Sequence, residues 1–385
     1  MKVRFWGVRG SIPTPALENL RYGGNTPCVE VRTSKGKILI FDGGSGFRLL
    51  GKQLLAEFGH KSIQGHMLLT HFHWDHIQGI PFFEPLYNPE NHFHFHSFIS
   101  RLGTVQEALE GQMSDPYFPV NMSIMQARRH FHQIGKEPLE LDDAVIHNLP
   151  LNHPQGCLGF RVECDGHVMV YATDNEPGSR EHDRNVRELA KNADLLIYDA
   201  QYTPYEYSNF KRGWGHSTWR EGVNIAEEVG VRQLILFHHD PDHNDVFLDS
   251  ITEEARKFFP NVMAAWEGLE IDLSLDQHMK PQPQEQIERR LGSRQPIRVP
   301  LRIRGMRPDG TPFQEDTSLE NLSVRGAFFL LDNDPDPNEP LQVEIRVAAE
   351  IEPGEPTQII ESRVVRNQDV KVANQSKRGI GVSFS

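Results

Sequence analysis

The sequence of 385 residues predicts an α+β protein in two parts, a large mixed part followed by a small β-barrel. Two observations carry this prediction. Four apolar runs within the first 240 residues each end in a His or an Asp, as expected of buried strands that leave a sheet at one edge. After Leu275 the apolar periodicity stops, and short strand-like runs separated by Gly and Pro follow.

The composition excludes several classes of protein. Hydrophobic residues make up 38%, enough for a sizeable core, and the net charge of −13 argues against tight binding of a long nucleic acid while leaving a small nucleotide open. The three Cys form no CxxC motif, so we expect neither a disulfide framework nor a Cys-based zinc site. The segment Met1–Trp6 leads straight into a strand without a signal-peptide core, and no membrane span is predicted. We therefore expect a cytoplasmic protein.

One short segment concentrates residues that bind metal ions. Met67–Thr70 is predicted to be a buried strand, and His71 and His73 follow it at positions i and i+2, which point the same way. Asp75 and His76 come one turn later and can face a second ion. Neutral imidazole is the commonest metal ligand in proteins, so this segment predicts a metal site.

Three further strand ends carry candidate ligands. Ala144–Pro150 leads to His153, Val168–Thr173 leads to Asp174, and Leu234–Phe237 leads to His238 and His239. We expect all of them at one edge of the core. Of the last pair we favour His238, because it is the first residue after its strand, but His239 remains an alternative.

The order HxHxDH, then His, then Asp, then His resembles the metallo-β-lactamase fold, an αββα sandwich, over about residues 1–275. The resemblance implies two divalent metal ions, of which zinc is the default and manganese or iron are alternatives. By that pattern His71, His73 and His153 would bind one ion, Asp75, His76 and His238 the other, and Asp174 would bridge them.

Other segments resemble the branch of this family that contains tRNase Z and the cyclic nucleotide phosphodiesterases. These segments are Phe5–Pro13, Tyr22–Cys28, Phe41–Gly46 and Gly215–Thr218. The resemblance implies that His216 helps to protonate the leaving group, and that Asp75 orients the attacking hydroxide as well as binding metal. Alternatively, Ser217 and Thr218 only begin a helix, because Thr218–Glu221 fits a capping box.

Two other stretches allow more than one interpretation. His92, His94 and His96 alternate with Phe, and we favour the polar side of a half-buried strand over a second metal face. In Gln112–Val120 the aromatic residues either stack on a base in the substrate pocket or belong to the core.

The chain after Leu275 is predicted to hold a linker at 276–286 and a separate domain at 287–385, after a hydrolase domain at 1–275. The strand-like runs of this last domain are Val299–Ile303, Gly326–Leu331, Leu341–Ala348, Thr357–Val365 and Gly379–Phe384. Short strands with Gly and Pro turns predict a small β-barrel.

This barrel resembles a PilZ domain, because both parts of that signature, RxxxR and (D/N)xSxxG, are present. The resemblance implies binding of cyclic di-GMP by Arg294, Arg298, Asn321, Ser323 and Gly326. Guanidinium groups match phosphate and the guanine edge. We favour Arg294 with Arg298, although Arg290 with Arg294 has the same spacing.

The sequence thus predicts a dinuclear phosphodiesterase that acts on a small nucleotide, such as a 3′,5′-cyclic nucleotide, with cyclic di-GMP as regulator; a homodimer is compatible with this. One alternative is a tRNase Z-like endoribonuclease, which would need a basic arm for tRNA that the sequence does not show. Another is a cyclic di-GMP-binding interaction protein with a non-catalytic hydrolase scaffold, which the complete ligand set disfavours.

Overall fold

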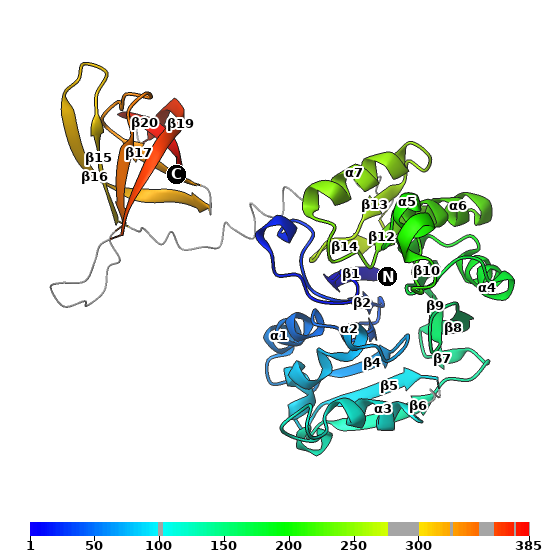
Figure 1. Ribbon diagram of the computed structural model, residues 1–385. Helices are drawn as coiled ribbons and strands as arrows, with labels where there is room; N and C mark the ends of the chain where they lie inside the picture. The colour runs from blue at the N-terminus through cyan, green and yellow to red at the C-terminus, as the bar shows by residue number, and fades with distance from the viewer. Residues whose placement is uncertain (99–102, 276–299, 324–325, 346–357, 373–374, 385) are drawn as a thin grey trace. The chain divides into compact units, whose positions relative to one another are not determined.

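A computed structural model describes residues 1–98, 103–275, 300–323, 326–345, 358–372 and 375–384. The chain divides into two compact units, Met1–Ile287 and Glu288–Ser385 (Figure 1). The predicted linker at 276–286 lies outside the described residues. Within the described ranges, no helix is both long enough and apolar enough to cross a membrane.

The first unit contains two sheets, each of seven strands in the described residues. The first sheet has the order β14-β1-β2-β3-β4-β5-β6. Its strands are β1 (Lys2–Gly7), β2 (Cys28–Arg32), β3 (Ile38–Phe41), β4 (Gln64–Leu68), β5 (His92–Ser97), β6 (Arg128–Gln133) and β14 (Glu270–Asp272). From β3 to β6 neighbouring strands are parallel, so their carboxyl ends meet at one edge.

The second sheet has the order β13-β12-β11-β10-β9-β8-β7. Its strands are β7 (Leu139–Leu141), β8 (Ala144–Leu151), β9 (Cys157–Cys164), β10 (His167–Ala172), β11 (Leu195–Asp199), β12 (Gln233–Phe237) and β13 (Val262–Ala264). The strands β10 to β13 are parallel, whereas β8 and β9 pair antiparallel.

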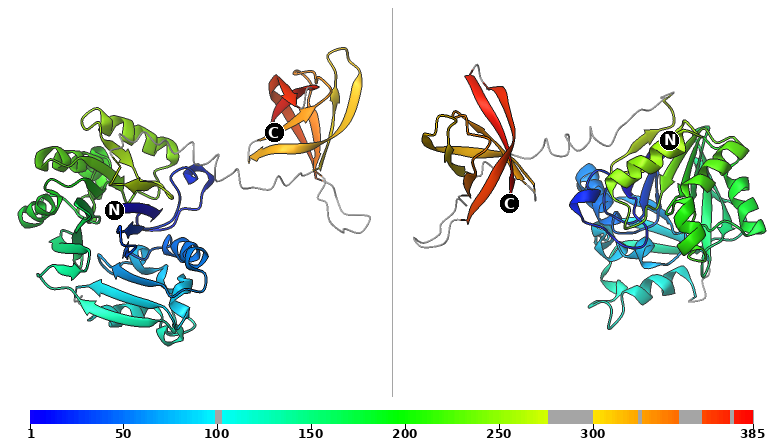
Figure 2. Two further views of the ribbon diagram at one scale, coloured as in Figure 1. Left: turned by 180° about the vertical axis from the view of Figure 1, so that it is seen from behind. Right: turned by 45° about the horizontal axis from the view of Figure 1, so that its top comes forward.

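Helices cover the outer faces of both sheets (Figures 1 and 2). They are α1 (Phe47–Phe58), α2 (Trp74–Ile77), α3 (Val105–Gln112), α4 (Arg180–Ala190), α5 (Pro204–Glu206), α6 (Trp219–Val229) and α7 (Asp245–Arg256). The helices α1 and α3 contact the first sheet, and α4, α6 and α7 contact the second. This arrangement confirms the predicted αββα sandwich.

Strand β3 shows why the first sheet is buried on both faces. Leu39 and Phe41 belong to the core that lies between the sheets, whereas Ile38 and Ile40 belong to the core beneath α1 and α3. Successive side chains of a strand point to opposite faces, so a continuous apolar run serves both cores.

The second unit is a closed barrel of order β15-β16-β17-β20-β19-β18, which confirms the predicted barrel. Its strands are β15 (Pro300–Met306), β16 (Pro312–Ser323), β17 (Gly326–Leu331), β18 (Leu341–Ile345), β19 (Gln358–Val372) and β20 (Gln375–Phe384). The strand prediction missed β16, because its many polar and acidic residues do not alternate with apolar ones.

Candidate metal centre

The candidate ligands lie together where strands of both sheets end. His71 and His73 follow β4, and Asp75 and His76 lie in the short helix α2. His153 follows β8, Asp174 follows β10 and His238 follows β12. Groups of these side chains that could share one ion have all their ligand atoms within 4.8 Å of one another.

A first triad is formed by His71, His73 and His153. The Nδ1 atom of His73 lies 2.9 Å from Nε2 of His71 and 3.0 Å from Nε2 of His153. On the far side of its ring, His153 donates from Nδ1 to the carbonyl oxygen of Gly215 at 2.8 Å. The Nε2 atom of His153 therefore presents a lone pair to the triad.

A second triad is formed by Asp75, His76 and His238. The Oδ2 atom of Asp75 and the Nε2 atoms of the two imidazoles are separated by 3.2 Å from one another. Around an ion with bonds of about 2.0–2.1 Å, the edges of a coordination tetrahedron are about 3.3–3.4 Å long. The second triad thus already has the size of one face of such a tetrahedron.

Asp174 lies between the two triads. Its Oδ1 atom is 3.8 Å from Nε2 of His71 and 3.7 Å from Nε2 of His153. Its Oδ2 atom is 3.3 Å from Nε2 of His76 and 3.4 Å from Nε2 of His238. Each triad therefore faces one oxygen of the same carboxylate, as a bridging ligand requires.

Hydrogen bonds from outside the triads fix the orientation of the second pair of imidazoles. His76 donates from Nδ1 to Oδ2 of the buried Asp42 at 2.8 Å. The Nδ1 atom of His238 lies 3.1 Å from Oε1 of Gln201. Such partners set the tautomer of a ligating histidine and leave Nε2 free for the ion.

The donor set fits divalent cations. Four carboxylates, those of Asp42, Asp75, Asp174 and Asp199, are buried here, and among the described residues their ion-pair partners are imidazoles. Burial of a negative charge is costly unless a positive charge balances it. Burial also lowers the pKa of His71, and that of His153 to about 4, so these two rings are neutral and ready to bind metal at neutral pH.

Backbone conformation at the site is strained. Asp42, Asp174 and His238 adopt positive φ angles of 59°, 56° and 61°. Non-glycine residues rarely occupy this region, and such strain gathers at functional sites. Close approach of the backbone also requires glycine at residue 10, since a Cβ atom on Gly10 would lie 2.5 Å from Nδ1 of His238.

His216 lies beside the triads but has its own partner. Its Nδ1 atom is 2.9 Å from Oδ2 of Asp199 and 3.6 Å from Oδ1 of Asp174. Burial opposes the charged form of His216, but the nearby carboxylates of Asp199, Asp174 and Asp75 together outweigh burial and raise the pKa of the imidazole. Thr218 also caps α6, because its side chain accepts from the backbone of Glu221 at 3.1 Å. Thr218 therefore caps the helix while His216, two residues earlier, lies beside the triads.

The structure separates His239 from His238. The Nε2 atom of His239 donates to the carbonyl oxygen of Ala265 at 2.9 Å, and burial lowers the pKa of His239 to about 3. Only His238 joins the triads.

Two site residues were absent from the sequence prediction. Asp199 is the last residue of β11, a signal like that of Asp174, and Asp42 lies in the already noted segment Phe41–Gly46.

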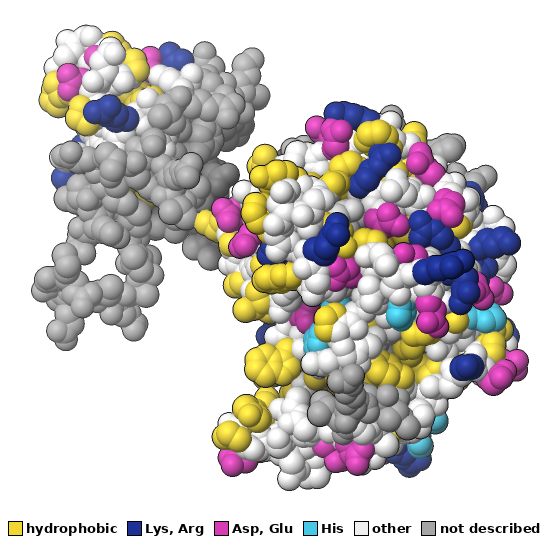
Figure 3. All heavy atoms as spheres, turned by 45° about the vertical axis from the view of Figure 1, so that its right-hand side comes forward, with side chains coloured by type: hydrophobic (Ala, Val, Ile, Leu, Met, Phe, Trp, Pro, Cys, Tyr) yellow, Lys and Arg dark blue, Asp and Glu magenta, His cyan; other side chains and the backbone are white. Residues whose placement is uncertain are grey.

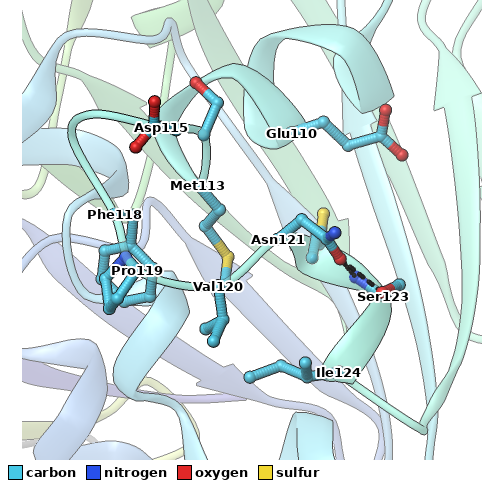
Figure 4. A pocket seen from close by; sticks show the side chains of 11 residues that line it. Glu110, Met113, Asp115, Phe118, Pro119, Val120, Asn121, Ser123 and Ile124 are labelled. Carbon is cyan, nitrogen blue, oxygen red and sulfur yellow. Dashed lines mark hydrogen bonds between the residues drawn. The ribbon is translucent and has the colours of Figure 1, made fainter.

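The aromatic residues of Gln112–Val120 divide between core and surface. Phe118 packs against the core beneath α1 and α3, whereas Tyr117 is exposed. The segment lines a cavity of about 810 Å³ together with residues up to Ile124 (Figure 4). None of the residues lining that cavity belongs to the triads, so the cavity gives no support to a substrate-pocket role.

In the barrel, the described part of the predicted cyclic di-GMP site spans two neighbouring strands. Asn321 and Ser323 lie in β16, Gly326 begins β17, and Ser323 pairs with Gly326 across the ladder. Arg294 and Arg298 lie outside the described residues. Backbone pairing thus brings the two ends of the (D/N)xSxxG motif together.

Fold and site define a metal-dependent hydrolase. Residues 48–239 match the family model of the beta-lactamase superfamily domain, and residues 268–385 match that of the PilZ domain. The chain thus belongs to the metallo-β-lactamase superfamily and carries a PilZ domain at its C-terminal end.

Similarity to individual proteins adds to the match with the family model. Ribonuclease Z of Methanosarcina mazei is 26% identical, over 71% of this chain and 98% of its own length. The metallo-beta-lactamase fold protein YhfI from Bacillus subtilis aligns with a TM-score of 0.53 at 21% identity, covering 70% of this chain and 98% of that one. A diphosphatase from the PhnP family aligns with a TM-score of 0.51 at 20% identity, covering 70% and 97%. The two solved structures support the fold, and the family model together with the ribonuclease Z relative supports the class of metal-dependent phosphoric diester hydrolases.

Proposed function

We propose that the first unit is a dinuclear phosphodiesterase of the cytoplasm that hydrolyses a small nucleotide, with 3′,5′-cyclic nucleotides as the substrate class. The observation that carries the proposal is the pair of triads that face opposite oxygens of Asp174. We assign the first ion to His71, His73 and His153, and the second to Asp75, His76 and His238. The imidazole-rich donor set favours zinc, and manganese or iron are alternatives.

When bound, the two ions supply positive charge for the phosphoryl oxygens and lower the pKa of water. The chain's own residues supply position and protons. Asp75 accepts from the backbone nitrogen of Ser11 at 2.8 Å, so its carboxylate is held in place to orient an attacking water. Asp199 holds the imidazole of His216, whose raised pKa favours the protonated form. His216 then donates a proton to the departing ribose oxygen, a contribution of about 10²–10⁴ in rate.

A tRNase Z-like endoribonuclease is the second candidate, since curated relatives carry the name ribonuclease Z. A long RNA binds through Lys and Arg that neutralise its phosphates. The chain has a net charge of −13, and on the face shown in Figure 3 acidic and basic side chains are interspersed. Charge therefore favours a small substrate. The third alternative, a scaffold without turnover, is opposed by the complete set of candidate ligands.

Reconstitution with zinc or manganese tests the proposal. We expect two ions per chain in the catalytic centre, hydrolysis of bis-nitrophenyl phosphate, and turnover of at least one cyclic nucleotide in a panel that also contains precursor tRNA. Asp75→Ala should abolish hydrolysis, and His60→Ala, at an exposed position, should leave it unchanged. Turnover of the tRNA alone would favour the second candidate. Two bound ions without any hydrolysis would favour the scaffold.

We further propose that the barrel binds cyclic di-GMP through Arg294, Arg298, Asn321, Ser323 and Gly326, and so regulates the hydrolase. The match to the PilZ family model supports this assignment. Calorimetry on the full chain should show binding that Arg298→Ala weakens at least tenfold. Arg304→Ala, which removes an Arg of β15 bonded to Gln314, is the matched control and should bind normally. Absence of binding to the wild-type chain at micromolar ligand would contradict the assignment.

A further inference from the structure

Five histidines form a ladder across three neighbouring strands of the first sheet. They are His66 in β4, His94 and His96 in β5, and His130 and His132 in β6. His66, His94 and His130 are aligned across the strands, and so are His96 and His132. All five therefore lie on one face of the sheet, on strands that Figure 1 shows side by side.

The imidazoles of this histidine ladder are stacked in two columns. Ring centroids are 4.8 Å apart between His66 and His94 and 4.7 Å apart between His96 and His132. Between the columns, Nδ1 of His66 lies 3.1 Å from Nε2 of His96, and Nδ1 of His94 lies 3.0 Å from Nε2 of His132. The ladder thus contains two pairs of nitrogens at the spacing found in the two triads.

A cavity gives access to both pairs. It has a volume of about 380 Å³ and is lined by four of the ladder histidines together with Glu137, Leu139 and Leu141. The two leucines belong to β7, the outermost described strand of the second sheet, so the cavity lies between the two sheets at their β6 and β7 ends. No side chain of the triads lines it.

Burial, together with neighbouring imidazoles, lowers the pKa of His66 to about 4 and that of His96 to about 3, so these two rings are neutral at physiological pH. A hydrogen bond between two neutral imidazoles uses the proton of one ring and the lone pair of the other. Neutral imidazole is a preferred ligand of zinc, nickel and copper. When the donating ring carries its proton on its other nitrogen, both facing nitrogens present lone pairs to an ion.

We propose that the histidine ladder binds one divalent transition-metal ion through Nδ1 of His66 and Nε2 of His96, separately from the catalytic centre. Two nitrogens 3.1 Å apart can both reach one ion at bonds of about 2.0–2.1 Å. This pair is chosen because His96 is only 3% exposed, whereas His132 of the second pair is exposed, so packing restricts the ring of His96 more. The rings of the two pairs are stacked at 4.8 Å and 4.7 Å, so an ion at the second pair would lie close to the first, where repulsion between dications disfavours it. Waters from the cavity complete the shell.

Metal counting on the full chain tests this proposal. After equilibration with zinc and removal of free ions, the wild-type chain should hold one ion more than the double variant His66→Gln/His96→Gln. The control His130→Gln removes an exposed ladder histidine that stacks on His94, and it should keep the wild-type count. Because the test compares the ion counts of two variants, its outcome does not depend on whether the catalytic centre binds two ions, one or none.

Copper provides a second measurement, since electron paramagnetic resonance of added Cu²⁺ should show coupling to two imidazole nitrogens that the double variant loses. Retained hydrolysis and an unchanged melting profile show that the variant is folded. If the double variant does not fold, His66→Gln alone, at a half-buried position, should lower the count by one. Equal counts in the wild type and a folded variant would refute the site, and so would loss of the ion in His130→Gln.

Discussion

Replacing Asp42 by Asn is the sharpest test of how the protein orients its metal ligands. Asp42 touches neither proposed ion, yet its carboxylate accepts from four groups at once. These are Nδ1 of His76 at 2.8 Å, the backbone nitrogen of Thr70 at 2.8 Å, the hydroxyl of Thr70 at 3.0 Å and the hydroxyl of Tyr171 at 3.0 Å. The side chain is fully buried, so water cannot take over these bonds.

The expected loss of stability follows from counting the hydrogen-bond donors around Asp42. The backbone nitrogen of Thr70 bonds to Oδ1, and His76 and Tyr171 bond to Oδ2. An amide has one accepting oxygen, so at least one buried donor loses its acceptor, at about 1–3 kcal/mol. The remaining bonds change from charged to neutral, at about 1 kcal/mol each. We expect a loss of about 3–5 kcal/mol in unfolding free energy and a 10–100-fold weaker affinity at the second triad.

Thermal unfolding and zinc competition with a chelator measure these two quantities. Asp142→Asn is the matched control, because the side chain of Asp142 is 93% exposed and pairs with Lys37 at 3.5 Å. We expect the control to behave as wild type within about 0.5 kcal/mol. An Asp42→Asn variant with wild-type stability and zinc affinity would refute the idea that this carboxylate fixes the tautomer of His76.

Four further substitutions test other parts of the site. His216→Ala should retain both catalytic ions and slow turnover by about 10²–10⁴ for substrates with poor leaving groups, but little for activated ones; equal losses on both would argue against proton donation. His238→Ala should lose the ion of the second triad, whereas His239→Ala should keep it and lose about 1–3 kcal/mol of stability, as metal analysis and melting will show. Thr218→Ala should cost about 1 kcal/mol of stability through loss of the α6 cap, with metal content unchanged.

The parts that the sequence predicted correctly share a physical basis. A buried strand has a strong apolar signal, so β8, β10 and β12 were placed within one residue at their starts, and the residues after their ends followed. The predicted strand at Met67–Thr70 was displaced, since β4 runs from Gln64 to Leu68. Its first residues, Gln64, Gly65 and His66, are not apolar enough to be recognised.

What the sequence did not predict depends on contacts between distant segments. Asp42 contacts Tyr171, 129 residues away, and His66 meets His96 only because β4 and β5 pair in parallel. For the same reason, His92, His94 and His96 were interpreted as the polar side of one strand. The contribution of β4 and β6 to the histidine ladder has no local signature.

Each triad takes ligands from both sheets. His71 and His73 come from the first sheet and His153 from the second, just as Asp75 and His76 oppose His238. Bound ions would therefore cross-link the two sheets, and the sheets could not separate without releasing the ions. Because only the folded chain offers this geometry, free metal concentration would set part of its resistance to unfolding. In a cell short of zinc, such a protein would lose catalytic activity and folding stability together.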